Sequence, residues 1–333
     1  VLMPVFNCEL YIKEAVDSIL NQTYTNFEFL IIDDASTDET VSIINSYNDV
    51  RIQLIEKPSN TGYTNSLNLG LQLAKGKYIA RMDGDDISLP ERFEKQVTFL
   101  EANLGFVLCG AWFEVIGSGL VVKAPDNFEA IKLALLKGNC IAHPSVMMRK
   151  QILDNFPVVY DVLKEPAEDY DLWVRLLSFG KLHNLQEVLL NYRVHSTQVS
   201  QKRQEQQSQS ALESRIEMLK YINYFFDKNE ISLLNKILMG SLFITFDEIK
   251  NFIVLKGKMI SSNSNHFFDS KGLEVYLFTL QKASLKKYFV DREKYYPIIC
   301  LQYFEIRGKS RFKLMLIDEL KLIIKSLIYF KRK

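Results

Sequence analysis

Arg81-Met82-Asp83-Gly84-Asp85-Asp86 follows directly on the apolar stretch 77–80 and places three carboxylates within four positions. Carboxylates a few ångströms apart raise one another's pKa unless a cation compensates their charge. Mg²⁺ or Mn²⁺ is the usual compensating ion, bound by one or two carboxylates together with the phosphate oxygens of a nucleotide. The same residues also suit a loop in which Gly84 turns the chain and aspartates stabilise the turn or begin the next helix. The stretch therefore predicts a metal site or an acidic turn.

Around this stretch, short apolar runs alternate with helical patterns, as is typical of βα units and a largely parallel sheet. The pattern predicts strands at 1–5, 27–32, 51–56, 77–82, 106–116 and 187–193. It predicts helices at 9–20, 40–47, 64–74 and 91–101, with mostly helix and loop over 127–180. We therefore expect the α/β class, with a Rossmann-like mixed sheet flanked by helices.

Charge divides the chain into two parts. Residues 1–200 carry a net charge of −9 and residues 201–333 a net charge of +10, within a total of +1. We therefore expect a catalytic domain over 1–200 and a basic, mainly helical domain over 201–333. The four cysteines are scattered, and no long apolar run or signal peptide is evident, so a cytoplasmic location is expected.

Polar residues follow several predicted strands at the edge where ligands bind in open α/β sheets. Asn7 follows the first strand, Asp33 and Asp34 follow the second, and Asp83 and Asp85 follow the fourth. These side chains should converge on one crevice, with Asp34 accepting a hydrogen bond from a nucleobase or ribose, Asp83 holding ribose or the metal, and Asp85 holding the metal. The alternative role for Asp33 and Asp34 is capping of the next helix.

Four segments resemble motifs of the family 2 glycosyltransferases, in the same order and spacing. They are Pro4-Val5-Phe6-Asn7, Asp33-Asp34-Ala35-Ser36-Thr37-Asp38, Asn60-Thr61-Gly62 and Arg81-Met82-Asp83-Gly84-Asp85-Asp86. The resemblance implies the GT-A fold, a nucleotide-sugar donor, Mn²⁺ or Mg²⁺ on the diphosphate, and inversion at the anomeric carbon. It also implies donor-site roles for Pro4, Phe6, Asn7, Asp33, Asp34, Asn60, Gly62, Arg81 and Asp83.

The segment Glu168-Asp169-Tyr170-Asp171 resembles the family's acidic pair at the start of a helix beneath the acceptor site. On this resemblance Asp169 is the catalytic base, and Glu168 orients it or binds the acceptor. A helix N-terminus favours the ionised carboxylate, which suits a base. The alternative is a helix cap with an Asp171–Arg175 ion pair.

His195 resembles the position at which many family members bring a histidine or arginine to the metal or diphosphate, although a lone histidine is often a packed surface residue. The chain lacks the Gln-x-x-Arg-Trp motif and membrane spans of the processive synthases. We therefore expect a non-processive enzyme that adds one sugar or a few, from a donor that is a UDP-sugar, to a saccharide or lipid-linked acceptor in cell-surface polysaccharide synthesis.

The tail 314–333 repeats apolar residues at helical spacing beside several lysines. Such a basic amphipathic helix can lie on an anionic membrane or pack its apolar stripe on its own domain. Homodimerisation through the helical half is left open, and no nucleic-acid motif is present. The competing functions are a nucleotidyltransferase that forms a nucleotide sugar, which would need a Gly-rich basic loop after the first strand, and an inactive binding module.

Overall fold

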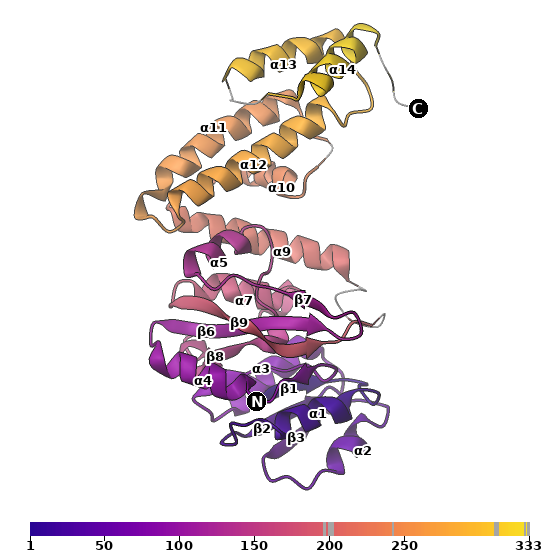
Figure 1. Cartoon of the computed structure of the whole chain (residues 1–333), viewed down its shortest axis with the longest axis vertical. Helices are drawn as coiled ribbons and strands as arrows, with labels where there is room; N and C mark the ends of the chain where they lie inside the picture. The colour runs from indigo at the N-terminus through magenta and orange to yellow at the C-terminus, as the bar shows by residue number, and fades with distance from the viewer. Residues whose placement is uncertain (196–197, 199–202, 242, 310–312, 330, 332–333) are drawn as a thin grey trace. The chain divides into compact units, whose positions relative to one another are not determined.

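The computed structural model describes residues 1–195, 198, 203–241, 243–309, 313–329 and 331 (Figure 1). The chain forms two compact units, residues 1–215 and residues 216–333.

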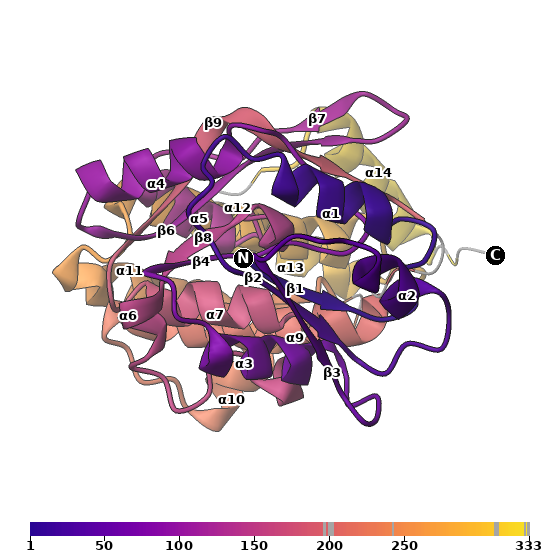
Figure 2. The ribbon, with the colours of Figure 1, turned by 90° about the horizontal axis from the view of Figure 1, so that it is seen from below.

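The first unit begins with a parallel sheet of three strands. Strands β1 (Leu2–Val5), β2 (Phe29–Asp33) and β3 (Ile52–Glu56) are ordered β1-β2-β3 and consist largely of apolar residues. Helices α1 (Ile12–Leu20) and α3 (Tyr63–Leu73) lie on opposite faces of this sheet, and α2 (Thr40–Asn45) lies beside α1 (Figure 2). Coverage on both faces explains why these strands carry continuous apolar runs.

A mixed sheet continues from the parallel one. Its strands are β4 (Tyr78–Ala80), β5 (Ile87–Ser88), β6 (Phe106–Val115), β7 (Leu120–Val122), β8 (Met147–Arg149) and β9 (Lys181–Tyr192). They are ordered β4-β8-β6-β9-β5, and β7 pairs with β6. Strand β6 runs parallel to β9, whereas β4 runs antiparallel to β8. A bridge between Leu2 and Arg81 joins the two sheets.

Helices cover the mixed sheet and connect its strands. They are α4 (Arg92–Ala102), α5 (Phe128–Leu135), α6 (Lys150–Leu153), α7 (Glu168–Leu176) and the short 3₁₀ turns His143–Ser145 and Val162–Lys164. Helix α7 is almost wholly buried, with Trp173 at its centre. Its first residues therefore hold a fixed position in the unit.

The second unit is helical, as the sequence predicts. Helix α9 (Gln204–Leu219) leads into it, followed by α10 (Lys228–Leu238), α11 (Phe246–Ser262), α12 (Ser270–Phe289), α13 (Pro297–Lys309) and α14 (Leu316–Leu327). Asp227 with Glu230, and Thr245 with Glu248, form reciprocal capping boxes at α10 and α11. Within the described residues, no helix is both long and apolar enough to cross a membrane.

Candidate active site

A cleft of about 1390 Å³ opens in the first unit beyond the carboxyl ends of β1, β2 and β4. It is the position at which ligands bind in open α/β sheets. Among its lining residues are nearly all the predicted site residues: Pro4, Phe6, Asn7, Asp34, Asn60, Gly62, Arg81, Asp83, Asp85, Glu168, Asp169 and His195. Residues up to 191 positions apart in the chain are thereby brought to one cleft.

Asp33 is the predicted residue that does not line the cleft. It is the last residue of β2, and successive strand residues point to opposite sides of a sheet, so Asp33 and Asp34 cannot share one direction. Its Oδ2 accepts a hydrogen bond from the Ser36 amide (3.0 Å), inside the following turn. Asp33 therefore bonds within the turn after β2 and lies outside the residues that line the cleft, and its role in donor binding stays a prediction.

The loops after β1 and β2 are hydrogen-bonded to each other. The Asn7 amide donates to Ser36 Oγ (2.9 Å), and Asn7 Oδ1 accepts from the Thr37 amide (2.9 Å). Asp38 accepts from the amides of Glu9 (3.1 Å) and Thr40 (3.0 Å), so it bonds the first residue of α2 and also joins the two loops. Asn7 therefore fixes the shape of the cleft floor as well as lining it.

Asp34 lies at the centre of a rigid polar cluster. Its carboxylate accepts hydrogen bonds from Lys57 Nζ (2.5 Å) and from the amides of Thr61 (2.9 Å) and Gly62 (2.8 Å). Gly62 has a φ of 93°, a conformation that side chains disfavour, and this lets its amide point at Asp34. A carboxylate has about four acceptor positions. One therefore remains for a ligand.

The three carboxylates after β4 form one cluster. Ligand oxygens of Asp83, Asp85 and Asp86 all lie within 4.8 Å of one another. Burial, together with repulsion from neighbouring aspartates, raises the pKa of Asp83 and of Asp86. Asp86 Oδ1 accepts from the Arg193 amide (2.8 Å), whereas its Oδ2 is buried and has no hydrogen-bond partner within the described residues.

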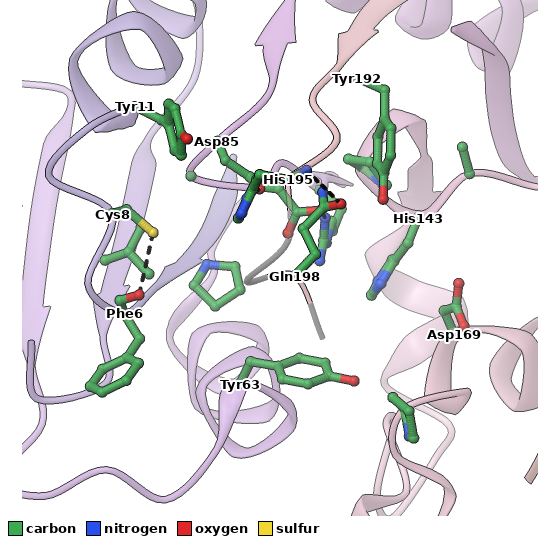
Figure 3. Close-up of a pocket in the computed structure, with 18 of the residues that line it drawn as sticks. Phe6, Cys8, Tyr11, Tyr63, Asp85, His143, Asp169, Tyr192, His195 and Gln198 are labelled. Carbon is green, nitrogen blue, oxygen red and sulfur yellow. Dashed lines mark hydrogen bonds and ion pairs between the residues drawn. The ribbon is translucent and has the colours of Figure 1, made fainter. Parts of the chain in front are cut away.

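This arrangement fits a divalent cation. An all-oxygen donor set suits Mg²⁺ or Mn²⁺, and such an ion would relieve the repulsion and satisfy the buried Asp86 oxygen. His195 Nε2 lies 2.8 Å from Asp85 Oδ2, so the predicted histidine is at the cluster (Figure 3). Asp86, the residue least clearly assigned from the sequence, belongs to it on the same terms as Asp83 and Asp85.

Two arginines support the carboxylate loop. The buried Arg81 forms an ion pair with Asp83. Burial by itself lowers the pKa of the Arg81 guanidinium, but the negative charge of Asp83 raises it by more, so the pKa is raised overall. Arg92, fully buried in α4, donates to the carbonyl oxygens of Arg81 (2.7 Å) and Val146 (3.1 Å). Arg92 thus fixes the backbone from which the cluster projects.

Glu168 and Asp169 open α7 on the far side of the cleft. Asp169 accepts hydrogen bonds from Asn139 Nδ2 (2.8 Å) and from the Tyr170 amide (2.7 Å). Glu168 Oε2 accepts from the Tyr63 hydroxyl (2.8 Å). Burial raises the pKa of both carboxyl groups, and the adjacent Asp169 charge raises that of Glu168 further. The pair retains a proton at a higher pH than isolated carboxyl groups do.

Figure 3 shows how these groups face one another. Asp85 and His195 lie together, Asp169 lies on the opposite side of the view, and Tyr63 lies below them with its hydroxyl directed toward the Asp169 side. His143 Nε2 is hydrogen-bonded to the Tyr160 hydroxyl (2.9 Å), and burial lowers its pKa well below the usual histidine value. A neutral His143 therefore forms part of the cleft wall.

Several residues that line the cleft, or that bond to residues lining it, are not predicted from the sequence. Lys57 and Asn139 reach Asp34 and Asp169 from separate loops, and Arg203 forms an ion pair with Glu165 at the rim. Glu165 also accepts from the Thr64 hydroxyl (2.6 Å). A lone lysine or asparagine in a polar loop carries no distinctive spacing, so nothing in the sequence separates these residues from ordinary surface positions.

Comparison with known proteins agrees with this geometry. Residues 1–156 match the model of "Glycosyl transferase family 2". An uncharacterised glycosyltransferase of Haemophilus influenzae is 34% identical over 284 residues, which cover 76% of this chain and 87% of that protein. The UDP-Glc:alpha-D-GlcNAc-diphosphoundecaprenol beta-1,3-glucosyltransferase WfaP of Escherichia coli is 34% identical over 205 residues, covering 60% of this chain and 78% of the relative.

The fold has a counterpart among solved structures. Staphylococcus aureus TarS residues 1–349, in complex with UDP-GlcNAc, superposes with a TM-score of 0.58 at 17% identity. The superposition covers 95% of this chain and 93% of the TarS chain. At this identity the likeness establishes the fold.

Proposed function

This chain belongs to glycosyltransferase family 2 and has the GT-A fold, as predicted, and we propose that it is a metal-dependent, inverting enzyme that uses a UDP-sugar. One observation carries the proposal: a carboxylate cluster suited to a cation and a partly protonated carboxyl pair face each other across one cleft. These are the two groups that a single displacement at a sugar carbon requires.

The donor nucleoside is assigned to the cluster around Asp34. The remaining acceptor position of Asp34 suits the imide N–H of uracil or a ribose hydroxyl, and Lys57 neutralises the carboxylate beside it. Pro4, Phe6, Asn60 and Gly62 line the same end of the cleft. WfaP, whose name gives UDP-Glc as its donor, supports the choice of a uridine nucleotide.

The donor diphosphate is assigned to the carboxylate cluster. Asp83, Asp85, Asp86 and His195 would hold Mn²⁺ or Mg²⁺, and the bound ion would stabilise the negative charge of the departing nucleoside diphosphate. Arg81 orients Asp83 and adds a buried positive charge near this end of the cleft. These residues therefore determine how easily the leaving group departs.

Asp169 is assigned the role of base. Its carboxylate takes the proton of the acceptor hydroxyl while that oxygen bonds to the anomeric carbon and the carbon–phosphate oxygen bond breaks. Attack from the face opposite the leaving group inverts the configuration. Asn139 and the helix N-terminus stabilise ionised Asp169, and Glu168, held by Tyr63, fixes the start of α7 beside the acceptor.

The acceptor is proposed to be a saccharide or a lipid-linked saccharide. WfaP, by its name, acts on a diphosphoundecaprenol-linked sugar, which supports a role in cell-surface polysaccharide synthesis. We infer that one sugar or a few are added.

The test is a donor screen with the full chain. UDP-Glc, UDP-Gal, UDP-GlcNAc and GDP-Man are incubated with a lipid-linked GlcNAc acceptor, with Mn²⁺ or with EDTA, and nucleoside diphosphate release is measured. We expect Mn²⁺-dependent release from a UDP-sugar, and proton NMR of the product should show the anomeric configuration opposite to that of the donor.

Two variants separate the assignments. Asp85→Asn should abolish both turnover and the thermal shift that Mn²⁺ gives with UDP, whereas Asp154→Asn, at an exposed aspartate of the same unit that does not line the cleft, should retain turnover. Full Mn²⁺-dependent activity in Asp85→Asn would overturn the metal assignment. Nucleotide binding without turnover of any donor would indicate a binding module, and nucleotide-sugar formation from UTP and a sugar phosphate would indicate a nucleotidyltransferase.

A further inference from the structure

Helix α14 presents its apolar side outward. Leu316, Ile317, Leu320, Ile324, Leu327 and Ile328 are between 51% and 72% exposed. They fall on one arc of the helix because they recur at spacings of three and four residues. We name these six side chains the α14 stripe.

The inward side of α14 is partly polar. Glu319 is buried and pairs with Arg307 of α13 (2.5 Å), Ser326 is buried, and Leu322 is the buried apolar residue among them. Helix α11 in the same unit shows the ordinary arrangement, because it buries Phe246, Phe252 and Met259. In the described residues the α14 stripe is therefore exposed and is not packed on the helices of its own unit.

Neighbouring positions extend the exposed apolar surface. On α13, Ile298, Leu301 and Phe304 are also exposed, and Tyr296 contacts Tyr329 across the helical hairpin. Large apolar side chains exposed together on two packed helices usually mark an interaction site.

Positive charge accompanies the stripe. Lys321 and Lys325 follow it around the helix, Lys313 precedes the helix, and Lys331 follows it. Against these four lysines stand Asp318 and Glu319 in the first turn of α14, so residues 313–331 carry a net charge of +2. Pairing two such surfaces would bring like charges together, whereas an anionic bilayer supplies the opposite charge and an apolar interior.

We propose that the α14 stripe docks the protein on an anionic phospholipid bilayer, with α14 lying in the interface. A helix of 12 residues is about 18 Å long, which is shorter than the roughly 30 Å hydrocarbon core, so it lies along the surface. The six apolar side chains enter the acyl boundary, and the lysines remain among the lipid headgroups. This docking does not depend on the proposed transfer reaction.

The experiment is cosedimentation of the full chain with vesicles of phosphatidylcholine and phosphatidylglycerol (7:3) or of phosphatidylcholine alone. We expect binding to the anionic vesicles that weakens with salt. The double variant Leu320→Gln with Ile324→Gln should reduce the vesicle–water partition coefficient by at least about tenfold. The double variant Lys321→Gln with Lys331→Gln should reduce the same coefficient by about fivefold for each lysine removed.

The matched control is Val254→Gln with Val275→Gln, two equally exposed apolar residues on α11 and α12, which should leave binding unchanged. Circular dichroism and the UDP thermal shift establish that each variant is folded. Absence of binding to anionic vesicles, or equal binding by the stripe variant, would overturn the proposal. The proposal would also be overturned if sedimentation velocity showed a dimer of the unmodified chain that the stripe variant no longer forms, with vesicle binding the same for both.

Discussion

Asp169 lies where burial opposes the ionisation of its carboxyl group, whereas the proposed reaction requires the ionised form. Burial raises the pKa of Asp169 in the folded chain. At a pH above the ordinary aspartate pKa, ionising this carboxyl group is therefore less favourable in the folded state than in the unfolded state. The carboxylate thus reduces stability at neutral pH. A residue kept against this cost is a good candidate for a catalytic one.

Asp169→Asn should therefore lose activity and gain stability. We expect the transfer rate to fall by about 10²- to 10⁴-fold and the free energy of unfolding at pH 7 to rise by about 1–3 kcal/mol. Transfer assays and thermal denaturation check both. Asp171→Asn, which removes the ion pair with Arg175 on the same helix, should retain transfer without a gain in stability. An Asp169→Asn variant that is inactive and less stable would indicate that the carboxylate supports the fold.

The pH profile should report the same group. Because burial raises the pKa of Asp169, the acid limb of kcat/KM should lie above the ordinary aspartate pKa of about 3.9. The Asn139 hydrogen bond lowers that pKa, so Asn139→Ala should move the limb to higher pH. Asn155→Ala removes an exposed side chain that donates to the carbonyls of Gln151 and Ile152, away from the cleft, and should leave the limb in place. An unmoved limb in Asn139→Ala would remove Asp169 from the role of base.

At the level of elements, the turn before α3 combines a backbone requirement with a site requirement. Gly62 has φ 93° and ψ 150°, a region open essentially to glycine, and its amide bonds to Asp34. Gly62→Ala should cost about 1–3 kcal/mol of stability and raise KM for the donor. Thermal denaturation and donor titration measure these effects.

Gly257→Ala is the matched control, because Gly257 lies on α11 with open space around its α-carbon. Removing a glycine from an exposed helix should add about 0.5–1 kcal/mol of stability and leave KM unchanged. If Gly62→Ala behaved in the same way, the positive φ would have no role in donor binding.

The sequence predicts the long elements better than the short ones. The helices and strands of the first βα units occur close to their expected positions because their apolar periodicity reports burial directly. Strands β5, β7 and β8 have three residues or fewer, too few to show a period. The direction of β4 was also not predictable, because its partner β8 lies 67 positions further along the chain.

The site follows the same rule. Asp83 and Asp85 stand in a compact motif whose spacing indicates a shared site, and the resemblance to a known family indicates Asp169; the roles of all three stay predictions. Arg92 acts through carbonyls of Arg81 and Val146, and only tertiary structure brings those groups to it.

For the whole molecule, the division at residues 215 and 216 predicts two unfolding events. Scanning calorimetry should show two transitions, because each unit has its own buried core. UDP with Mn²⁺ should raise only the transition of residues 1–215, which contain the cleft. A single transition shifted as a whole would show that the units unfold as one.

The bridge between Leu2 and Arg81 has a further consequence for the first unit. The Met82 amide bonds to the Leu2 carbonyl (3.0 Å) and the Arg81 amide to the Val146 carbonyl (3.0 Å), so the carboxylate loop is held from both sheets. Groups fixed in this way lose little freedom when substrates arrive. Folding has then already aligned the groups that contact donor and acceptor, so little entropy is lost when the reacting atoms are brought into line. This preorganisation contributes to the rate of transfer.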